Sequence, residues 1–417
     1  MTSCKRDTSN VEWQSACFFA LLIFSLTLAG CSGASAPNAG LPARSSVGAA
    51  NTYTGKLGTS PSQTDTQLWS VAIDHEQNTY SYSAPAATVN SAVSAKGTFS
   101  EVNGFLLLLD KNGYQLGYGI EVPGQMTILR PGNSSTQPIF SIQQSSCFPI
   151  IGNDLKFQFV LVPGSTTQGQ AAFGKVYAGT NSSGTLWTFD GQALYQAPGA
   201  STLINAYIPG YPTSYSGVCN SSPSATSIQV SDSQSYTVPT QYMVNSSGFF
   251  LEDQNFNGSP QFSSLNLGDI PSIGVAEPSA PVVTATMASA TYRGFLFAAN
   301  NGSYLTQPVG FGGVTSKSSI SGGTFPSEDV TQPPNTNMII NFGQQDTLNN
   351  GLYYLAKFTL PIGPSESCSA PSTDPNGNTI CTYSAAAIVG NPGGKYVIFL
   401  TSFTGSGYQK FLVLFQQ

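Results

Sequence analysis

The segment from Asp253 to Gly258 has a spacing of oxygen-bearing side chains that suits a hard cation. It reads Asp-Gln-Asn-Phe-Asn-Gly, so Asp253, Asn255 and Asn257 occupy alternate positions before a glycine. Calcium takes about six to eight oxygen ligands, and alternating Asp and Asn side chains supply the first half of a calcium loop. The twelfth position, where a bidentate glutamate would complete the loop, is Ser264. These three residues are a candidate calcium site, and an Asn-Gly hairpin turn is the alternative.

His75 is the only histidine, and it lies between Asp74 and Glu76. Adjacent residues of a strand point to opposite faces, so Asp74 cannot readily orient His75 as the acid of a catalytic triad does. Asp74 and Glu76 could share a face as a carboxylate pair for acid–base work or a metal. We expect instead a solvated turn between two strands. With one histidine, most zinc chemistry and Ser-His-Asp chemistry are excluded unless His75 takes part.

Other catalytic motifs are missing from the sequence. It has no Gly-x-Ser-x-Gly nucleophile elbow, no P-loop, and no Gly-x-Gly-x-x-Gly between a strand and a helix. Glycoside hydrolysis needs two carboxylates at a set separation, which sequence spacing does not give. The carboxylates considered for it are Glu121, Glu252 and Glu277. Trp69 and Trp187 could stack on sugars, but each lies in a strand-like pattern that predicts burial.

Composition limits the class of protein. Only 8% of residues are charged and the net charge is −6, which argues against a nucleic-acid partner because such proteins need a basic surface. Hydrophobic residues make up 40% of the chain, with 25 Phe and 19 Tyr, which argues against global disorder. A folded, weakly charged body is therefore expected.

The N-terminus has the three parts of a secretory signal. Lys5 and Arg6 provide positive charge, residues 16–28 form an apolar run, and small residues precede Cys31 in Leu28-Ala29-Gly30-Cys31. This pattern resembles the lipobox of bacterial lipoproteins, in which the cysteine is lipidated and becomes the mature N-terminus. The resemblance implies a signal peptide over residues 1–30 and acyl chains on Cys31 that hold the protein to membrane lipid.

Residue Ser32 follows the lipidated position, and the lack of Asp there favours the outer membrane, in the sorting pattern of lipoproteins. Residues 31–50 are rich in Ser, Ala, Gly and Pro. Such a segment cannot bury enough apolar surface to offset its chain entropy. It predicts a flexible tether with an end-to-end reach of about 25 Å.

Four cysteines remain after Cys31, and an even number suits an oxidising compartment. Three pairings are possible for Cys147, Cys219, Cys368 and Cys381. We favour Cys368–Cys381, because the turn sequence from 374 to 377 between them would bring two strands together. That leaves Cys147–Cys219. A metal site is the alternative, although no Cys-x-x-Cys spacing exists and the histidine is remote in sequence.

The body shows the patterns of β-strands. Residues 79–83 and 156–159 alternate in polarity, which is typical of strands with one buried face, whereas residues 105–109, 396–400 and 411–415 are continuously apolar, as in strands buried on both faces. The Asn-Gly pairs at 112–113, 257–258, 301–302 and 376–377 mark turns between such runs. The sequence predicts an all-β fold of antiparallel meander barrels or sandwiches.

A short repeat predicts that the body is built from related units. Tyr-x-Gly occurs at Tyr53, Tyr177 and Tyr292, about 120 residues apart. We therefore divide the chain into β unit one (51–172), β unit two (173–289) and β unit three (290–417). Residues 174–190 resemble one strand pair of a quinoprotein-type β-propeller blade, so a propeller is the alternative architecture.

Two functions are consistent with these observations. The first is a lipid-anchored cell-envelope protein with a non-catalytic binding or structural role and no cofactor apart from the candidate calcium. Its partner would be an envelope glycan or protein. The alternative is an envelope hydrolase that uses carboxylates on glycans, for which a cleft between two carboxylates would be the evidence.

Overall fold

The structure is a computed structural model that describes the chain in segments. The described residues are 50–57, 69–86, 92–143, 155–161, 173–180, 186–195, 204–205, 215–218, 228–231, 235–238, 240–244, 248–254, 270–300, 303–362, 368, 371–374, 377–403 and 410–417. Several predictions concern residues outside these segments, namely the Leu28–Cys31 motif, nearly all of the tether, Cys147, Cys219, Asn255 and Asn257.

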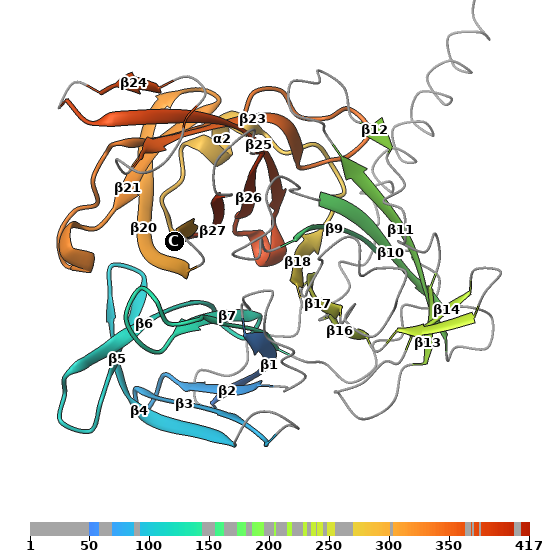
Figure 1. The fold of residues 1–417 in the computed structure, drawn as a ribbon, viewed down its shortest axis with the longest axis horizontal. Helices are drawn as coiled ribbons and strands as arrows, with labels where there is room; N and C mark the ends of the chain where they lie inside the picture. The colour runs from blue at the N-terminus through green and yellow to red at the C-terminus, as the bar shows by residue number, and fades with distance from the viewer. Residues whose placement is uncertain are drawn as a thin grey trace, which may run out of the picture. The chain divides into compact units, whose positions relative to one another are not determined.

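Barrel one is a closed barrel in which each strand pairs antiparallel with the next and the last pairs with the first. Its eight strands are β1 (Asn51–Leu57), β2 (Trp69–Asp74), β3 (Thr79–Ala84), β4 (Val93–Val102), β5 (Phe105–Leu109), β6 (Gln115–Val122), β7 (Met126–Arg130) and β8 (Ile139–Ile142). They are drawn in blue to teal in Figure 1.

The interior of barrel one is filled by side chains. Alternate residues such as Tyr53, Ile73 and Leu108 belong to one buried cluster contributed by strands around the barrel. The predicted two-sided burial of residues 105–109 is confirmed: Leu106 and Leu108 join this interior cluster, whereas Phe105 joins a second cluster outside the barrel. The barrel interior therefore holds a packed cluster of its own side chains.

The middle sheet has ten strands in the order β15-β14-β13-β11-β10-β9-β18-β17-β16, with β12 paired to β11. The strands are β9 (Leu155–Leu161), β10 (Phe173–Thr180), β11 (Leu186–Tyr195), β12 (Ile204–Asn205), β13 (Tyr215–Val218), β14 (Ile228–Ser231), β15 (Ser235–Val238), β16 (Thr240–Val244), β17 (Phe249–Gln254) and β18 (Ile270–Ala276). The stretch that resembles a propeller blade is here the β10–β11 hairpin of this sheet.

Barrel two follows a short helix, α2 (Thr284–Ala288). Its strands are β19 (Tyr292–Asn300), β20 (Ser303–Ser316), β21 (Ser319–Thr324), β22 (Met338–Asn341), β23 (Leu352–Pro361), β25 (Thr379–Gly390), β26 (Val397–Phe403) and β27 (Lys410–Gln416). Pairing of β23 with β25 and of β27 with β19 closes these eight strands into a ring. The extra strand β24 (Pro371–Thr373) pairs only with β25 among the described strands.

The two barrels share an up-and-down topology and a local sequence feature. Tyr53 and Tyr292 lie in the first strand of their barrels, and both side chains belong to the interior clusters. The glycine two residues later, Gly55 or Gly294, faces the last strand of the same barrel. Two of the three Tyr-x-Gly repeats thus take equivalent places, and the third lies in β10 of the middle sheet.

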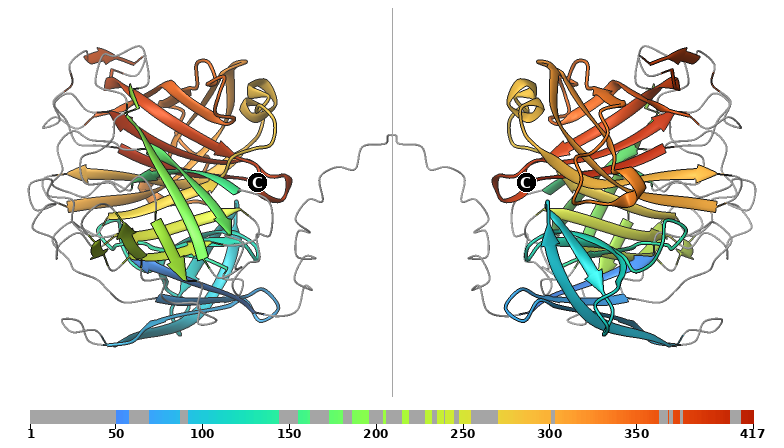
Figure 2. Two further views of the ribbon diagram at one scale, coloured as in Figure 1. Left: turned by 90° about the vertical axis from the view of Figure 1, so that its right-hand side faces the viewer. Right: turned by 90° about the vertical axis from the view of Figure 1, so that its left-hand side faces the viewer.

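A continuous apolar core joins the three sheets. One buried cluster contains Phe140 of β8, Val160 of β9, Phe249 of β17 and Phe297 of β19. The Phe140 and Phe297 rings lie 5.4 Å apart between centroids, and residues 44–417 form one compact unit. Figure 2 shows the strands of the three sheets from two further directions.

The observed sheets differ in extent from the predicted units. Strand β9, which the 172/173 boundary assigns to β unit one, pairs with β10 and β18 of the middle sheet. The all-β prediction with antiparallel barrels is confirmed, and closed barrels stand in place of the propeller alternative. Among the described residues, no helix is both long and apolar enough to cross a membrane.

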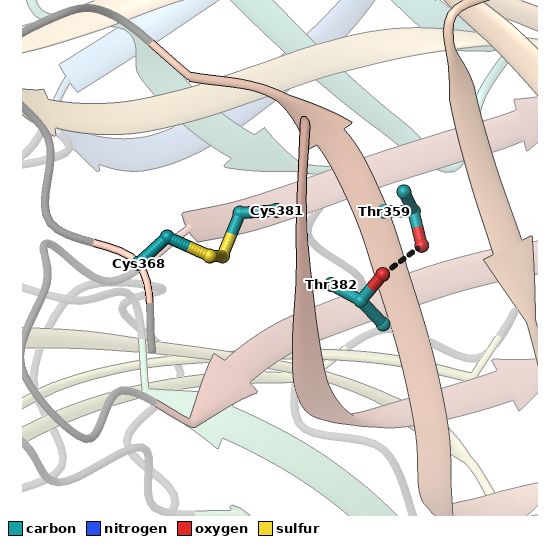
Figure 3. Close-up of a disulfide and its surroundings, with 4 residues drawn as sticks. All are labelled: Thr359, Cys368, Cys381 and Thr382. Atoms are coloured by element: carbon teal, nitrogen blue, oxygen red, sulfur yellow. Dashed lines mark hydrogen bonds between the residues drawn. A yellow bond between two sulfur atoms is a disulfide. The ribbon is translucent and has the colours of Figure 1, made fainter. Parts of the chain in front are cut away.

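The predicted Cys368–Cys381 pair is bonded in the structure, with 5.9 Å between the Cα atoms (Figure 3). It links the segment before β24 to β25, and the two strands are joined by the turn that begins at Asp374. Beside it, the hydroxyl groups of Thr359 and Thr382 form a 2.8 Å hydrogen bond across the β23–β25 closure of barrel two.

The turn at Asp374 has the same sequence pattern and hydrogen bonds as the turn at Asp110. Each begins Asp-x-Asn-Gly. In both turns the Asp carboxylate accepts the backbone N–H four residues later, at 2.8 Å, and the glycine, Gly113 or Gly377, has a φ of +83°. Asp suits these positions because its carboxylate accepts backbone N–H groups of the turn, and Gly suits them because it tolerates the left-handed conformation.

Candidate functional site

A group of hydrogen-bonded polar side chains around the histidine lies in barrel one and is named here the His75 cluster: His75, Glu101, Glu121, Tyr53 and Asn51. His75 is in the β2–β3 turn, Glu101 on β4 and Glu121 on β6. Ile120 and Val122 face the shared core outside the barrel, so the intervening Glu121 points to the barrel interior.

The local sequence places His75 against these glutamates. The Asp74 carboxylate accepts the backbone N–H groups of Glu76 and Gln77 at 2.9 and 3.0 Å, which holds the turn. Asp74 therefore serves its own turn, as predicted. The predicted turn between two strands is present, since residues 75–78 join β2 to β3 and Glu76, Gln77 and Asn78 are exposed. His75 itself is half-buried, because its ring packs edge-on against Phe99, with centroids 5.4 Å apart.

Both ring nitrogens of His75 are hydrogen-bonded to carboxylates. Nδ1 donates to Glu101 Oε1 at 2.8 Å and Nε2 donates to Glu121 Oε2 at 2.7 Å. The Glu121 side chain is 3% exposed and the Glu101 side chain 61% exposed. The hydrogen bond to Glu121 is the main cause that raises the pKa of His75 to about 9, with Glu101 adding to it and burial opposing it. The ring is therefore an imidazolium at neutral pH.

The other oxygen of Glu121 is bonded within the barrel. Oε1 accepts from the Tyr53 hydroxyl and, at 3.3 Å, from Asn51 Nδ2. The Tyr53 hydroxyl in turn accepts the backbone N–H of Gly124 at 2.9 Å. Burial, followed by the charge of Glu121, raises the pKa of Tyr53 above its ordinary value. The buried carboxylate is thus matched by donors from β1 and the β2–β3 turn.

The His75 cluster stabilises a protonated imidazole, and it does not present a free base that could accept a proton from a substrate. A protonated ring with two committed N–H groups has no lone pair for a substrate or a metal. Glu101 and Glu121 are the one carboxylate pair that the hydrogen bonds bring together around His75, and the imidazole occupies the space between them. A sugar hydrolase needs that space for substrate or water.

A second polar group, named here the Arg130 cluster, joins the two barrels and consists of Arg130, Tyr118, Thr306 and Glu328. Arg130 ends β7 and its side chain is 1% exposed. Its guanidinium donates to the Glu328 carboxylate at 2.6 and 3.2 Å and to the carbonyl oxygen of Thr306 on β20. The Tyr118 hydroxyl donates to the backbone oxygen of Glu328. Arg130 also lies 4.9 Å from the Tyr118 ring centroid.

Further contacts accompany this cluster. Asn103 Nδ2 donates to the Val330 carbonyl at 2.8 Å, and Arg293 Nε donates to the Asn103 carbonyl at 2.9 Å. Arg293 also lies 5.9 Å from the ring centroid of Phe325. The turn at Asn103 in barrel one is therefore held between β19 and the segment that follows β21.

The other sequence candidates lie elsewhere. Glu277 accepts the backbone N–H of Asn350 at 3.0 Å, in a turn of barrel two. Glu252 belongs to β17, and its side chain is outside the described part of the structure. Trp69 is 5% exposed in the barrel interior, as predicted, and Trp187 lies on β11. Asp253 lies on β17, and Asn255 and Asn257 lie outside the described residues. The calcium site therefore stays a prediction.

The sequence pointed to His75 and to Glu121 separately, but it did not connect them and did not single out Glu101 or Arg130. Glu121 carried a signal, since it is a lone acid between Ile120 and Val122 in a strand that is otherwise apolar at its end. Arg130 carried another, because it directly follows the buried run from Met126 to Leu129. A charge within a buried run predicts a buried partner, but the partner's identity depends on tertiary structure.

We expect the contribution of His75 to folding stability to fall in the alkaline pH range. Its pKa is higher in the folded state than its ordinary 6.5, so the stability it contributes is complete below pH 6.5 and is lost as pH rises through about 9. Partial solvent access reduces the effect, which we put at about 2 kcal/mol. Urea unfolding of the parent and of His75→Gln at pH 6, 8 and 9.5 measures it. The gap between the two proteins should narrow with pH, and parallel curves would contradict the assignment.

Comparisons with known proteins give weak likenesses. No family model matches the chain, and no curated protein does. Among solved structures, transferrin binding protein B from Neisseria meningitidis is 12% identical with a TM-score of 0.27, over 84% of this chain and 65% of that one. Two variants of transferrin binding protein B from Haemophilus parasuis are 8% identical, with TM-scores of 0.25 and 0.24, over 89% of this chain and 76% of theirs. This chain spans about 65% of the length of the meningococcal protein that it resembles.

Proposed function

We propose that this chain is a lipid-anchored, non-catalytic binding protein of the bacterial cell envelope, held to the outer membrane through acylated Cys31. The lipobox-like motif at Leu28 to Cys31 supports the anchor. The observation that carries the proposal is that the first strand of the described residues begins at Asn51, twenty residues after Cys31, so the lipobox-like motif precedes the described barrel in the sequence.

The packing of the body supports a binding role on outer surfaces. Both barrels are filled by their own side chains, and one core joins them to the middle sheet. Loops and outward strand faces on such a scaffold are the surfaces that we expect to contact a partner. The partner would be an envelope protein or glycan, since the net charge of −6 disfavours nucleic acid.

Lipidation is the part of this proposal that one substitution tests. In cells fed labelled palmitate, the Cys31→Ala protein should carry no label. The acyl chains would be attached to the Cys31 sulfur and to the Cys31 α-amino group, which cleavage of the signal peptide frees. The variant should also leave the membrane fraction. Cys17→Ala is the matched control, since it changes another cysteine of the leader while keeping its apolar run, and it should label normally. Label that persists in Cys31→Ala would refute the anchor.

The choice of membrane is tested separately. If the sorting pattern of lipoproteins applies, Ser32→Asp should move the protein from outer-membrane to inner-membrane fractions in a density gradient while labelling stays unchanged. A protein that is labelled but found in the inner membrane without that substitution would contradict the outer-membrane assignment and leave lipidation intact.

A further inference from the structure

We propose that the Arg130 cluster fixes the register of barrel one against barrel two and is not a source of net stability. The proposal concerns the folded body alone and does not depend on the anchor. Three observations support it: what the cluster costs, how apolar its surroundings are, and how its bonds are directed.

The cluster is costly to form. The Arg130 side chain is 1% exposed and its guanidinium has lost its water, and attraction to the Glu328 carboxylate, which is 27% exposed, need not offset that loss. Arg130 Nε and Thr306 Oγ1 are buried and have no hydrogen-bond partner in the described structure. In addition, Ser327 and Glu328 have φ values of 50° and 58°, a left-handed conformation that non-glycine residues rarely adopt.

The surrounding contact between the barrels is mostly aromatic. Phe105 of barrel one packs against Phe295 and Phe325, with ring centroids 6.1 and 5.5 Å apart. Phe140 packs against Phe297 in the same cluster. Apolar attraction is large but has no direction, so such a surface tolerates more than one relative setting of the two barrels.

The polar bonds supply the missing direction. The planar guanidinium meets the Glu328 carboxylate with two hydrogen bonds, a geometry that allows one orientation. The same group reaches the Thr306 carbonyl on β20, and the Thr306 N–H donates to Ser134 of barrel one at 2.7 Å. Barrel one is thus tied both to β20 and to the segment after β21, so a rotation or slide breaks at least one tie.

A double-mutant cycle in the full chain separates register from stability. The variants are Arg130→Met, Glu328→Leu and the two combined, with thermal unfolding as the first measurement. Glu328→Leu leaves the buried Arg130 charge without its carboxylate partner and should lower Tm by about 5 °C, whereas Arg130→Met leaves the partly exposed Glu328 charge and should lower Tm by less. The combined change removes both charges and should return Tm to within about 2 °C of the parent.

The second measurement is the distance distribution between spin labels on the two barrels. Labels attached through non-natural amino acids at Thr98 and Ser384, both exposed, leave the cysteines untouched. The parent should give one narrow distance, and the combined variant should give a broad or split distribution. The isosteric Glu328→Gln, which keeps the shape and removes the charge, should broaden it in part.

Three results would overturn the proposal. A combined variant with recovered Tm and an unchanged narrow distance would show that packing alone fixes the register. A combined variant as unstable as the single variants would show that the cluster is a stabilising element. If the combined variant fails to fold, Glu328→Gln decides: the same narrow distance distribution as in the parent would show that the Arg130 cluster does not fix the register.

Discussion

Gly55→Ala should destabilise barrel one by at least about 3 kcal/mol, among the larger effects of any single methyl group in this chain. Gly55 lies in β1 where it pairs with Ser141 of β8, the pair that closes the barrel. A Cβ built on Gly55 would overlap the carbonyl oxygen of Phe140 and approach the Ser141 Cα to 2.5 Å. These are backbone atoms of a buried strand, so the strands must separate at the closure to make room.

The counterpart in barrel two gives an internal replicate. Gly294 has the same place in β19, and its Cβ would overlap the carbonyl oxygen of Val413 on β27. Gly294→Ala should therefore be as damaging as Gly55→Ala. Gly312→Ala is the mild control, since its nearest neighbour is the Thr291 hydroxyl at 3.3 Å and the residue is exposed. It should change the free energy of unfolding by less than about 1 kcal/mol.

Denaturant unfolding followed by fluorescence measures these differences, with Trp69 inside barrel one as a local reporter. If Gly55→Ala unfolds at the parent's denaturant midpoint, the close approach of β1 and β8 is not a feature of the protein. If only one of the two barrels is sensitive, the Tyr-x-Gly positions are not equivalent, and the resemblance between the barrels ends at their topology.

These glycines also show what the sequence could predict. The Tyr-x-Gly repeat marked Tyr53 and Tyr292 as related positions, and the strands around them were predicted from alternation and apolar runs. The closure itself was not predictable, because the pairing of β1 with β8 joins residues far apart in sequence and depends on register. Alternation fixes which face is buried but not which strand lies beside it.

The cysteines follow the same division between local and distant information. Cys368 and Cys381 are 13 residues apart, and the intervening turn is encoded by its own Asp and Gly. Their pairing could therefore be predicted. The unit boundary at 172/173 does not coincide with a boundary between sheets, because β9 pairs with β18, which follows it by more than a hundred residues.

The candidate site was half predictable for the same reason. His75 was recognised from its rarity and its acidic neighbours, and Asp74 holds the turn as expected. The carboxylates that bond the His75 ring come instead from β4 and β6, 26 and 46 residues away. Adjacent acids in sequence are thus a poor guide to which carboxylates a histidine contacts once strands are paired.

Glu121→Ala should lower the free energy of unfolding by about 3–5 kcal/mol, because it removes the only buried charge that the His75 imidazolium contacts. It also leaves the Tyr53 hydroxyl without its carboxylate acceptor inside the barrel. His75 should then titrate much closer to its ordinary pKa, since the hydrogen bond to Glu121 is the main cause of its raised value. Urea unfolding at pH 6.5 and a proton NMR titration of the ring measure the two effects independently.

The matched control acts on the same ring from its other side. Glu101 bonds Nδ1 at 2.8 Å, almost the same distance as Glu121 bonds Nε2, but its side chain is 61% exposed. Solvent screens an exposed pair, so Glu101→Ala should cost at most about 1 kcal/mol and lower the pKa of His75 only slightly. The two hydrogen bonds differ in burial and hardly in length. If Glu101→Ala and Glu121→Ala lowered the free energy of unfolding equally, burial would not be the reason for the larger contribution expected of Glu121.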